Sequence, residues 1–173
     1  STSFTIKSTI GDLYLTQTNI KNREFITLES NGLIKIFKSG IPNIPVISKL
    51  IEVPQDAEVV IKIISYDEEI IKMSDYGFSN KIIPAQPSLS KSDDPDDVPF
   101  FFNENIYQTD SYVNTDIAIY EETGILRALR LGRIEIRPIQ YNPVQNQLKI
   151  INNLIIEIEF VNANFPKTKL LKQ

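Results

Sequence analysis

The 173-residue chain contains no cysteine, no histidine and no tryptophan, and only one methionine. Without Cys and His, the chain has no cysteine nucleophile, no Ser-His pair, no histidine base and no ordinary zinc site. No disulfide can cross-link the fold, so its stability must come from its hydrophobic core. We therefore expect a chain that is not itself an enzyme and that needs no cofactor and no metal.

A long apolar run and an excess of positive charge are also missing. No run approaches the roughly 20 apolar residues that span a bilayer, and no signal peptide is recognisable at the start. The 18 Lys and Arg are outnumbered by 22 Asp and Glu, which argues against a nucleic-acid or anionic membrane partner. We expect no membrane span and no nucleic-acid partner, and we interpret the chain as a fragment whose signal peptide would lie upstream.

The abundant residues are those that favour β-strands, namely Ile, Val, Thr, Tyr and Phe. Apolar and polar residues alternate over 25–28, 59–63, 129–137, 147–151 and 154–160. Short strands with turn residues between them predict an all-β fold, either an antiparallel β-sandwich or a strongly curved double sheet. No segment predicts a helix of three turns, and we interpret 66–73 as a second strand that follows a turn.

Two details of the strand pairing can be predicted. The apolar phase of 129–137 changes near Gly132, which indicates a β-bulge at that glycine. Residues 141–146 are typical of a hairpin connection, so strand 129–140 would pair with 147–151.

The alternation also assigns side chains to faces. In the last strand we expect the apolar residues in the core and the acids outside: Ile156, Ile158 and Phe160 against Glu157 and Glu159. These glutamates are the default cross-strand partners of a group of arginines, Arg127, Arg130, Arg133 and Arg137. Tyr107 and Tyr141 are expected to be half-buried, with their hydroxyls at the rim.

Residues 80–105 break the strand pattern. Their prolines forbid a central strand and disfavour a helix, and their serines and aspartates disfavour burial: Pro84, Pro87, Pro95 and Pro99. The segment predicts a long, extended, proline-rich loop of a kind that is usually functional or disordered. We expect residues 84–99 to be mobile.

The centre of this loop concentrates charge, in the order Ser90, Lys91, Ser92, Asp93, Asp94, Pro95, Asp96 and Asp97. The carboxylates could hold calcium, but the spacing lacks the glycine of an EF-hand and a proline interrupts it, so a solvated acidic loop is the simpler interpretation. Lys91 is a lone cation on an extended segment, which is a shape that a protease subsite accepts. Composition alone favours the other interpretation, a solvated lysine on a mobile loop.

Three stretches occur in a fixed order over about residues 40–160. They are Gly-Ile-Pro-Asn-Ile-Pro-Val-Ile-Ser at 40–48, the segment from Pro84 through Lys91 to Phe100, and the segment from Arg130 through Pro-Ile-Gln-Tyr-Asn-Pro-Val at 138–144 to Glu157. Together they resemble the N-terminal prodomain of the gingipain family (peptidase family C25), which are secreted bacterial cysteine proteases of caspase-like fold. The resemblance implies a single β-sandwich prodomain over 1–165 that contains loop 80–105. Residues 166–173 would then be a basic tail or the pro/mature junction.

The resemblance also implies a function. The chain would be the non-catalytic prodomain of a cysteine endopeptidase zymogen, keeping the enzyme latent and assisting its folding. Lys91 matches the basic residue that the family inserts into the specificity pocket, and the inhibitory loop around it comprises Ser90, Ser92, Asp93 and Asp94. The implied partner is a caspase-like cysteine protease domain in the same precursor, secreted or at the cell surface after export through the periplasm. The candidate cleavage sites are Lys91, Lys167, Lys169 and Lys172.

A second class of function is a β-sandwich adhesion or carbohydrate-binding module of a secreted or surface protein. Such modules expose an aromatic platform, and residues 100–102 are three consecutive phenylalanines. Successive residues of a strand alternate faces, so at most two of the three rings could share a side. The more economical interpretation packs Phe100 and Phe102 into the core.

Overall fold

The computed structural model describes residues 2–35 and 38–172. Nine strands and three short helices make up its regular structure. In chain order these are β1 (Ser3–Ser8), β2 (Leu13–Ile20), β3 (Arg23–Ser30), β4 (Ile47–Glu52), β5 (Glu58–Lys72), the 3-10 helix η1 (Met73–Tyr76), α1 (Glu104–Gln108), β6 (Ala118–Leu126), β7 (Leu129–Ile136), β8 (Ile139–Asn142), β9 (Gln147–Val161) and α2 (Phe165–Leu171). The predicted all-β, antiparallel fold is confirmed.

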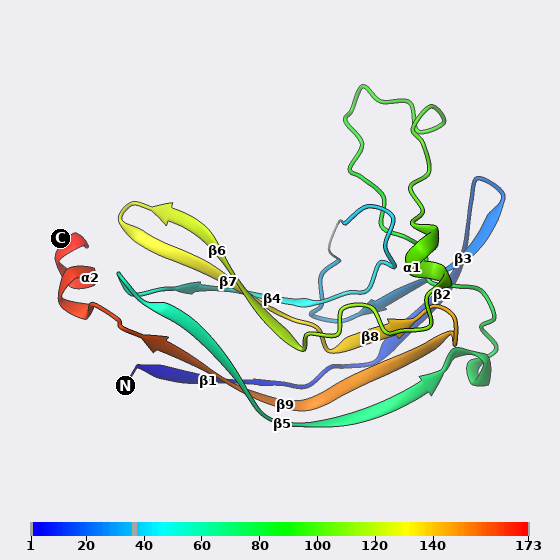
Figure 1. Ribbon diagram of the computed structural model, residues 1–173. Coiled ribbons are helices and arrows are strands. Elements are labelled where there is room, and N and C mark those ends of the chain that lie inside the picture. Colours follow the sequence, from blue (N-terminus) through cyan, green and yellow to red (C-terminus); the bar gives the residue numbers. More distant parts are fainter. Residues whose placement is uncertain (1, 36–37, 173) are drawn as a thin grey trace.

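Strand β9 organises the largest sheet. β5 follows it along one side over its full length, and β1 and β8 share the other side, all of them antiparallel. A second sheet has the strand order β4-β7-β6, and β2 and β3 form a separate hairpin. Figure 1 shows the two larger sheets lying one over the other, with both termini at one end and the β2–β3 hairpin reaching the other end.

The two faces of β9 follow its sequence alternation. Ile156 and Ile158 are fully buried and Phe160 packs against the same cluster, whereas Glu157 and Glu159 lie on the other face and bond to side chains of neighbouring strands. These assignments are confirmed. Because β-strand side chains alternate, one face of β9 can be apolar while the other stays in water.

The turn expected before 66–73 is absent, because these residues continue β5 without a break through Lys72. The strand has register shifts between Ile63 and Ser65 and between Ser65 and Asp67. A bulge bends and twists a strand without ending it, so the 15-residue strand can curve along β9. The prediction of two strands was therefore wrong.

The pairing expected for 129–140 is correct only in its last part. β8 pairs with residues 147–150 of β9, but β7 lies in the other sheet, between β4 and β6. The irregularity predicted at Gly132 lies in the partner strand, between Glu122 and Gly124 of β6. Gly132 has another role, because a Cβ at this position would overlap the ring of Tyr120.

β7 lies in a different sheet from β9. Arg130 and Arg133 of β7, and Arg137 directly after it, therefore pair with residues other than Glu157 and Glu159. Arg130 makes a bidentate pair with Glu122 at 2.8 Å for both contacts, and Arg133 pairs with Glu121 on the same strand, β6. Arg137 pairs with Glu135 at 2.7 Å, two residues away along its own chain. The predicted cross-strand pairing was thus right in kind but wrong in partner for Arg130 and Arg133, and wrong in kind for Arg137.

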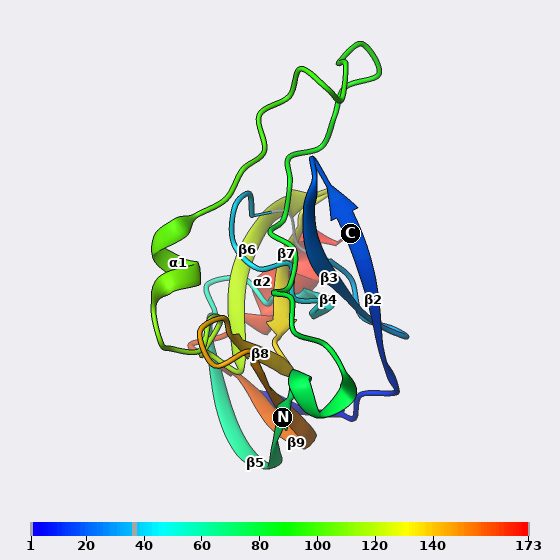
Figure 2. The same cartoon turned by 90° about the vertical axis from the view of Figure 1, so that its right-hand side faces the viewer.

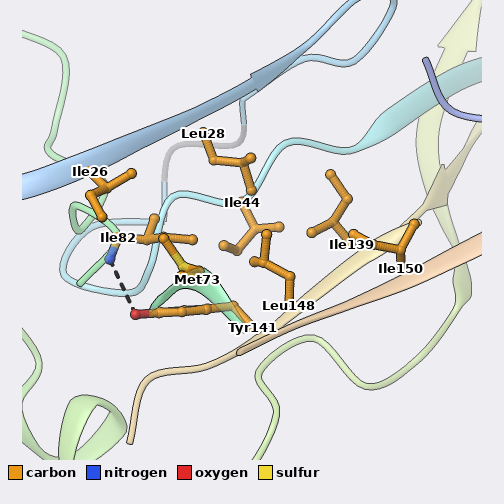
Figure 3. Packing of buried hydrophobic residues seen from close by; sticks show 9 residues of the cluster. All are labelled: Ile26, Leu28, Ile44, Met73, Ile82, Ile139, Tyr141, Leu148 and Ile150. Carbon is orange, nitrogen blue, oxygen red and sulfur yellow. Dashed lines mark hydrogen bonds between the residues drawn. The ribbon is translucent and has the colours of Figure 1, made fainter. Parts of the chain in front are cut away.

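Two clusters of buried residues hold the layers together. One joins β7 and β9 between the two larger sheets: Ile134, Ile136, Ile151, Leu154, Ile156 and Ile158. The other lies below the β2–β3 hairpin and is drawn in Figure 3: Ile26, Leu28, Ile44, Met73, Ile82, Ile139, Tyr141, Leu148 and Ile150. Ile82 belongs to this second cluster, and the chain enters the irregular segment directly after it.

Tyr107 and Tyr141 are fully buried, so the prediction that they would be half-buried at the rim was wrong. The Tyr107 hydroxyl donates to the carbonyl of Ile82 at 2.7 Å. The Tyr141 hydroxyl accepts from the Ile82 amide at 3.2 Å, as Figure 3 shows, and donates to Asn146 Oδ1 at 2.7 Å. Burial raises the pKa of both phenols. A buried hydroxyl needs partners, and Ile82 supplies one to each tyrosine.

Replacing Tyr141 by Phe should destabilise the fold. The ring would still fill its site, but the Ile82 amide and Asn146 Oδ1 would each lose a partner, at a cost of about 1–3 kcal/mol in the free energy of unfolding. The matched control is Tyr112→Phe. Among the residues that the structure describes, this partly exposed hydroxyl bonds only to Gln147, at 3.3 Å, and its loss should cost less than about 1 kcal/mol. Urea unfolding measures both, and equal costs would contradict the role given to Tyr141.

Candidate functional site

The irregular segment 86–102 projects from the body of the protein. Figures 1 and 2 show it rising beyond the sheets at the end of the molecule away from the termini. Residues 88–97 are all exposed. We call this segment the projecting loop.

The predicted loop boundaries at 80 and 105 were too wide. Residues 82–85 are buried, and they are paired, with Ile82 beside Ile26 and Pro84 beside Pro42. At the other end, helix α1 begins at Glu104, where the Asn103 side chain accepts from the Ile106 amide. The structure therefore fixes both ends of the projecting loop in the body of the protein.

A neck closes the projecting loop where it leaves the body. The Gln86 side chain bonds to the backbone of Phe101 on the opposite limb, donating to its carbonyl at 2.8 Å and accepting from its amide at 2.9 Å. Just below, Gly40 donates to the Ala85 carbonyl and accepts from the Asn103 amide. The side chain of Gln86 and the backbone amide and carbonyl of Gly40 thus bridge the two limbs.

Aromatic rings pack beside the neck. The Phe25 ring lies 5.6 Å from that of Phe100 and 6.4 Å from that of Phe102, and Phe102 stacks on Tyr107 at 4.3 Å between centroids. The Arg23 guanidinium covers Phe102 at 4.4 Å, an arrangement favoured by the ring quadrupole. Phe100 and Phe102 are partly buried by these contacts and only Phe101 is exposed. The three phenylalanines therefore do not form the exposed platform that carbohydrate binding would need.

The tip of the projecting loop consists of two consecutive turns. In the first, the Asp93 amide donates to the Ser90 carbonyl at 3.1 Å and the Asp93 carboxylate accepts from the Ser90 amide at 2.7 Å. In the second, the Asp97 amide donates to the Asp94 carbonyl at 3.1 Å. Serine and aspartate side chains close such turns with their own backbone, so the polar residues of the tip give it local order.

The structure brings the five residues of the predicted inhibitory loop together in the first turn and at its end: Ser90, Lys91, Ser92, Asp93 and Asp94. Lys91 is exposed, and its ammonium has no hydrogen-bond or ion-pair partner among residues 2–35 and 38–172. Asp93 and Asp94 accept from backbone amides of the tip. In the described ranges no three acidic side chains come together as a metal site.

One residue that contacts the projecting loop was not predicted from the sequence. Lys21, at the tip of the β2–β3 hairpin, donates to the carbonyls of Val98 at 2.6 Å and Asp96 at 3.3 Å. A separation of 75 and 77 residues leaves no local signal in the sequence. The contact exists only because the hairpin folds beside the loop.

Of the other candidate cleavage residues, Lys167 and Lys169 lie on α2 and Lys172 directly follows it, at the opposite end of the molecule in Figure 1. Most of the predicted basic tail 166–173 is helical, and Asn164 caps this helix by accepting from the Lys167 amide at 3.0 Å. Lys167 pairs with Asp56 at 2.6 Å and Lys172 with Glu52 at 2.5 Å, while Lys169 is exposed.

Across the described residues, no helix is long and apolar enough to cross a membrane.

Comparison with known proteins identifies relatives of the whole chain. Residues 1–171 match the model of the family described as Propeptide_C25. Lys-gingipain of Porphyromonas gingivalis is 35% identical over 168 residues, which are 97% of this chain and 10% of that protein. Gingipain R2 of the same species is 25% identical over 125 residues, 72% of this chain and 16% of that protein. The chain thus spans about a tenth of the length of the first of these relatives.

Two solved structures share the fold. One, described as "Structural insight into zymogenic latency of gingipain K from Porphyromonas gingivalis", superposes with a TM-score of 0.85 at 35% identity, over 94% of this chain and 88% of that one. The other, "Complex of Porphyromonas gingivalis RgpB pro- and mature domains", has a TM-score of 0.78 at 20% identity, over 94% and 82%. At 20% identity, the likeness to the second structure shows a shared fold only.

Helix α2 should loosen in acid. Hydrogen bonds from Lys167 and Asn164 hold the pKa of the Asp56 carboxyl below its ordinary value of 3.8. A carboxyl with a lowered folded pKa stabilises the folded state above its unfolded pKa, and this contribution is lost as the pH falls through the folded pKa. We expect the amide-exchange protection of α2, corrected for intrinsic rates, to fall between about pH 5 and pH 2.

The control for this prediction is Asp56→Asn. Asp56 has φ 63°, a conformation that asparagine also tolerates, and the amide cannot titrate. Protection of α2 in this variant should be lower at neutral pH and should change less on acidification. The same acid response in both proteins would contradict the assignment to Asp56.

Proposed function

This chain belongs to the Propeptide_C25 family, and from that membership we propose that it is the prodomain of a gingipain-like cysteine endopeptidase zymogen and keeps the enzyme latent through its projecting loop. In this proposal Lys91 enters the specificity pocket of a caspase-like protease domain encoded in the same precursor. Ser90 and Ser92 flank it, and Asp93 and Asp94 follow at the rim of the cleft.

The observation that carries the proposal is an unpaired cation on a projecting tip. The Lys91 ammonium is exposed and has no partner in the part of the chain that the structure describes. It therefore loses no intramolecular contact when an acidic pocket binds it, and the pair gains from the low dielectric of a closed cleft. Residues 88–97 are exposed on both limbs, which lets a cleft close around the tip.

The neck explains how such a loop could resist its target enzyme. A protease that cut at Lys91 would leave two limbs still joined by Gln86 and Phe101 and rooted in the aromatic cluster. The cleaved ends would stay near the cleft at a high effective concentration. Release would then be slow even after cleavage.

Further parts of the proposal concern the precursor. We place the pro/mature junction in the C-terminal segment, with Lys167, Lys169 and Lys172 as candidate cleavage sites. Peptide recognition by β-addition needs an extended chain, so cleavage there requires α2 to unfold. The precursor would be secreted or held at the cell surface after export through the periplasm, and the prodomain would assist the folding of the protease domain.

Replacing Lys91 by Ala should weaken inhibition strongly. Removing one partner of a desolvated charge pair costs about 2–5 kcal/mol, which at about 1.4 kcal/mol per tenfold is a rise of roughly 30- to several-thousand-fold in the inhibition constant. The measurement is titration of the mature protease domain of the same precursor with the separate 173-residue chain.

Two variants control this experiment. Lys91→Arg keeps the charge and should retain part of the inhibition, and Lys49→Ala removes an exposed lysine on β4, away from the projecting loop, and should change nothing. Circular dichroism checks that each variant folds. If Lys91→Ala inhibits as well as the unmodified chain, the role passes from Lys91 to another part of the surface.

The acids of the tip should govern the rate of association. Asp93, Asp94, Asp96 and Asp97 lie on exposed turns, and rim charges act mainly on the on-rate, which salt screens over about 10 Å at 0.1 M. We expect added salt to slow association in stopped-flow mixing. Replacing all four by Asn should slow it at low salt and remove most of the salt dependence. An on-rate that ignores salt in the unmodified chain would refute an electrostatic role.

A further inference from the structure

We infer that Lys21 is a positioning residue, which holds the projecting loop in the orientation that docks. This inference rests on the proposed function and adds to it a residue far from the tip in sequence. Lys21 donates to the carbonyl of Asp96, within the second turn of the tip, and to that of Val98, which directly follows this turn on the descending limb. Figure 2 shows the tip of the β2–β3 hairpin reaching up toward the projecting loop.

The contact of Lys21 with the loop is important because of where on the loop it lies. The neck acts at Gln86 and Phe101, and the aromatic contacts begin at Phe100. Among the described residues, only Lys21 hydrogen-bonds from outside the loop to any residue of 87–99. Without it, the limbs above the neck would be tied to the body of the protein by no hydrogen bond within the described ranges.

The backbone at Lys21 supports the same inference. Lys21 and Asn22 have φ values of 48° and 61°, and they connect residues 20 and 23 as a two-residue hairpin turn. Positive φ at both central positions is typical of a type I′ turn, which favours Asn, Asp and Gly. Asn22 fits that preference, but lysine is uncommon in this conformation. A strained residue is a reason to look for a role, and here the strain occurs at the residue whose ammonium contacts the loop.

The physical consequence is pre-organisation. A loop that samples several orientations binds with an affinity reduced by the fraction of time it spends in the competent one. A lysine with two carbonyl acceptors narrows that distribution before the partner arrives, so less ordering entropy is lost on binding. Lys21 would thereby strengthen docking without touching the protease pocket.

The variant that tests this inference is Lys21→Asn. Asparagine suits the left-handed turn, so the hairpin should keep its conformation and the free energy of unfolding should not fall. The two hydrogen bonds to the loop would be lost. In the free 173-residue chain we expect faster amide exchange at 90–98 and unchanged exchange in β9. Against the mature protease domain of the same precursor, the inhibition constant should rise roughly 3- to 30-fold.

Three further variants make the result specific. Lys21→Arg keeps donors for both carbonyls, so exchange at 90–98 should stay slow and most of the affinity should remain, in contrast to Lys21→Asn. Lys49→Asn removes an unrelated exposed lysine and should change neither the exchange nor the affinity. Lys91→Ala separates the two hypotheses, because it should weaken inhibition while leaving exchange at the limbs as it is. Normal inhibition by Lys91→Ala would reject the role of Lys91. Faster exchange at 90–98 and weaker inhibition in Lys21→Asn would still support the role of Lys21.

The inference is overturned by either of two outcomes. In the first, Lys21→Asn leaves exchange at 90–98 unchanged, so that the contact does not hold the loop. In the second, exchange accelerates but the inhibition constant of Lys21→Asn stays the same. Faster exchange, weaker inhibition and rescue by Lys21→Arg together would support it.

Discussion

The backbone of Ile82 is the point on which the rest of the structure depends. Its carbonyl accepts from Tyr107 and its amide donates to Tyr141, both in the buried core. Ile82 precedes the projecting loop and Tyr107 follows it, so the first of these bonds joins the two roots of the loop directly. Such bonds are costly to break where water cannot replace them. They fix the separation of the two limbs before any partner is present.

Above this root, the loop is held by successively weaker and more exposed contacts. The bridge of Gln86 to Phe101 closes the neck, the rings of Phe25 and Phe100 pack beside it, and the ammonium of Lys21 reaches the limb above. Among the described residues, only the first turn of the tip, which carries Lys91, is held by local hydrogen bonds alone. An inhibitor benefits from this gradient, because a fixed base limits the entropy lost on binding while a solvated tip offers its side chains without prior loss of contacts.

The molecule separates two tasks in space. The projecting loop lies at one end and α2 at the other (Figure 1), with the two sheets between them. In the proposed zymogen, docking at the loop and cleavage near α2 would therefore involve different surfaces. Lys167 of α2 pairs with Asp56, and Lys172 after the helix pairs with Glu52; these exposed pairs stabilise the helix only modestly, so it can open without disturbing the core that roots the loop.

Much of this could be predicted from the sequence by itself. Local alternation determined parts of β3, β5, β7 and β9 and the inner face of β9, since side-chain period is a property of neighbours in the chain. Prolines and aspartates marked the irregular segment, and the order of the motifs indicated the family. Long-range pairing was decided only by the tertiary structure: β7 joins β4 and β6, β5 runs on through its bulges, Tyr107 and Tyr141 are buried at Ile82, and Lys21 reaches the loop. These features depend on which distant surfaces come to lie together when apolar faces are buried, and no local pattern encodes that choice.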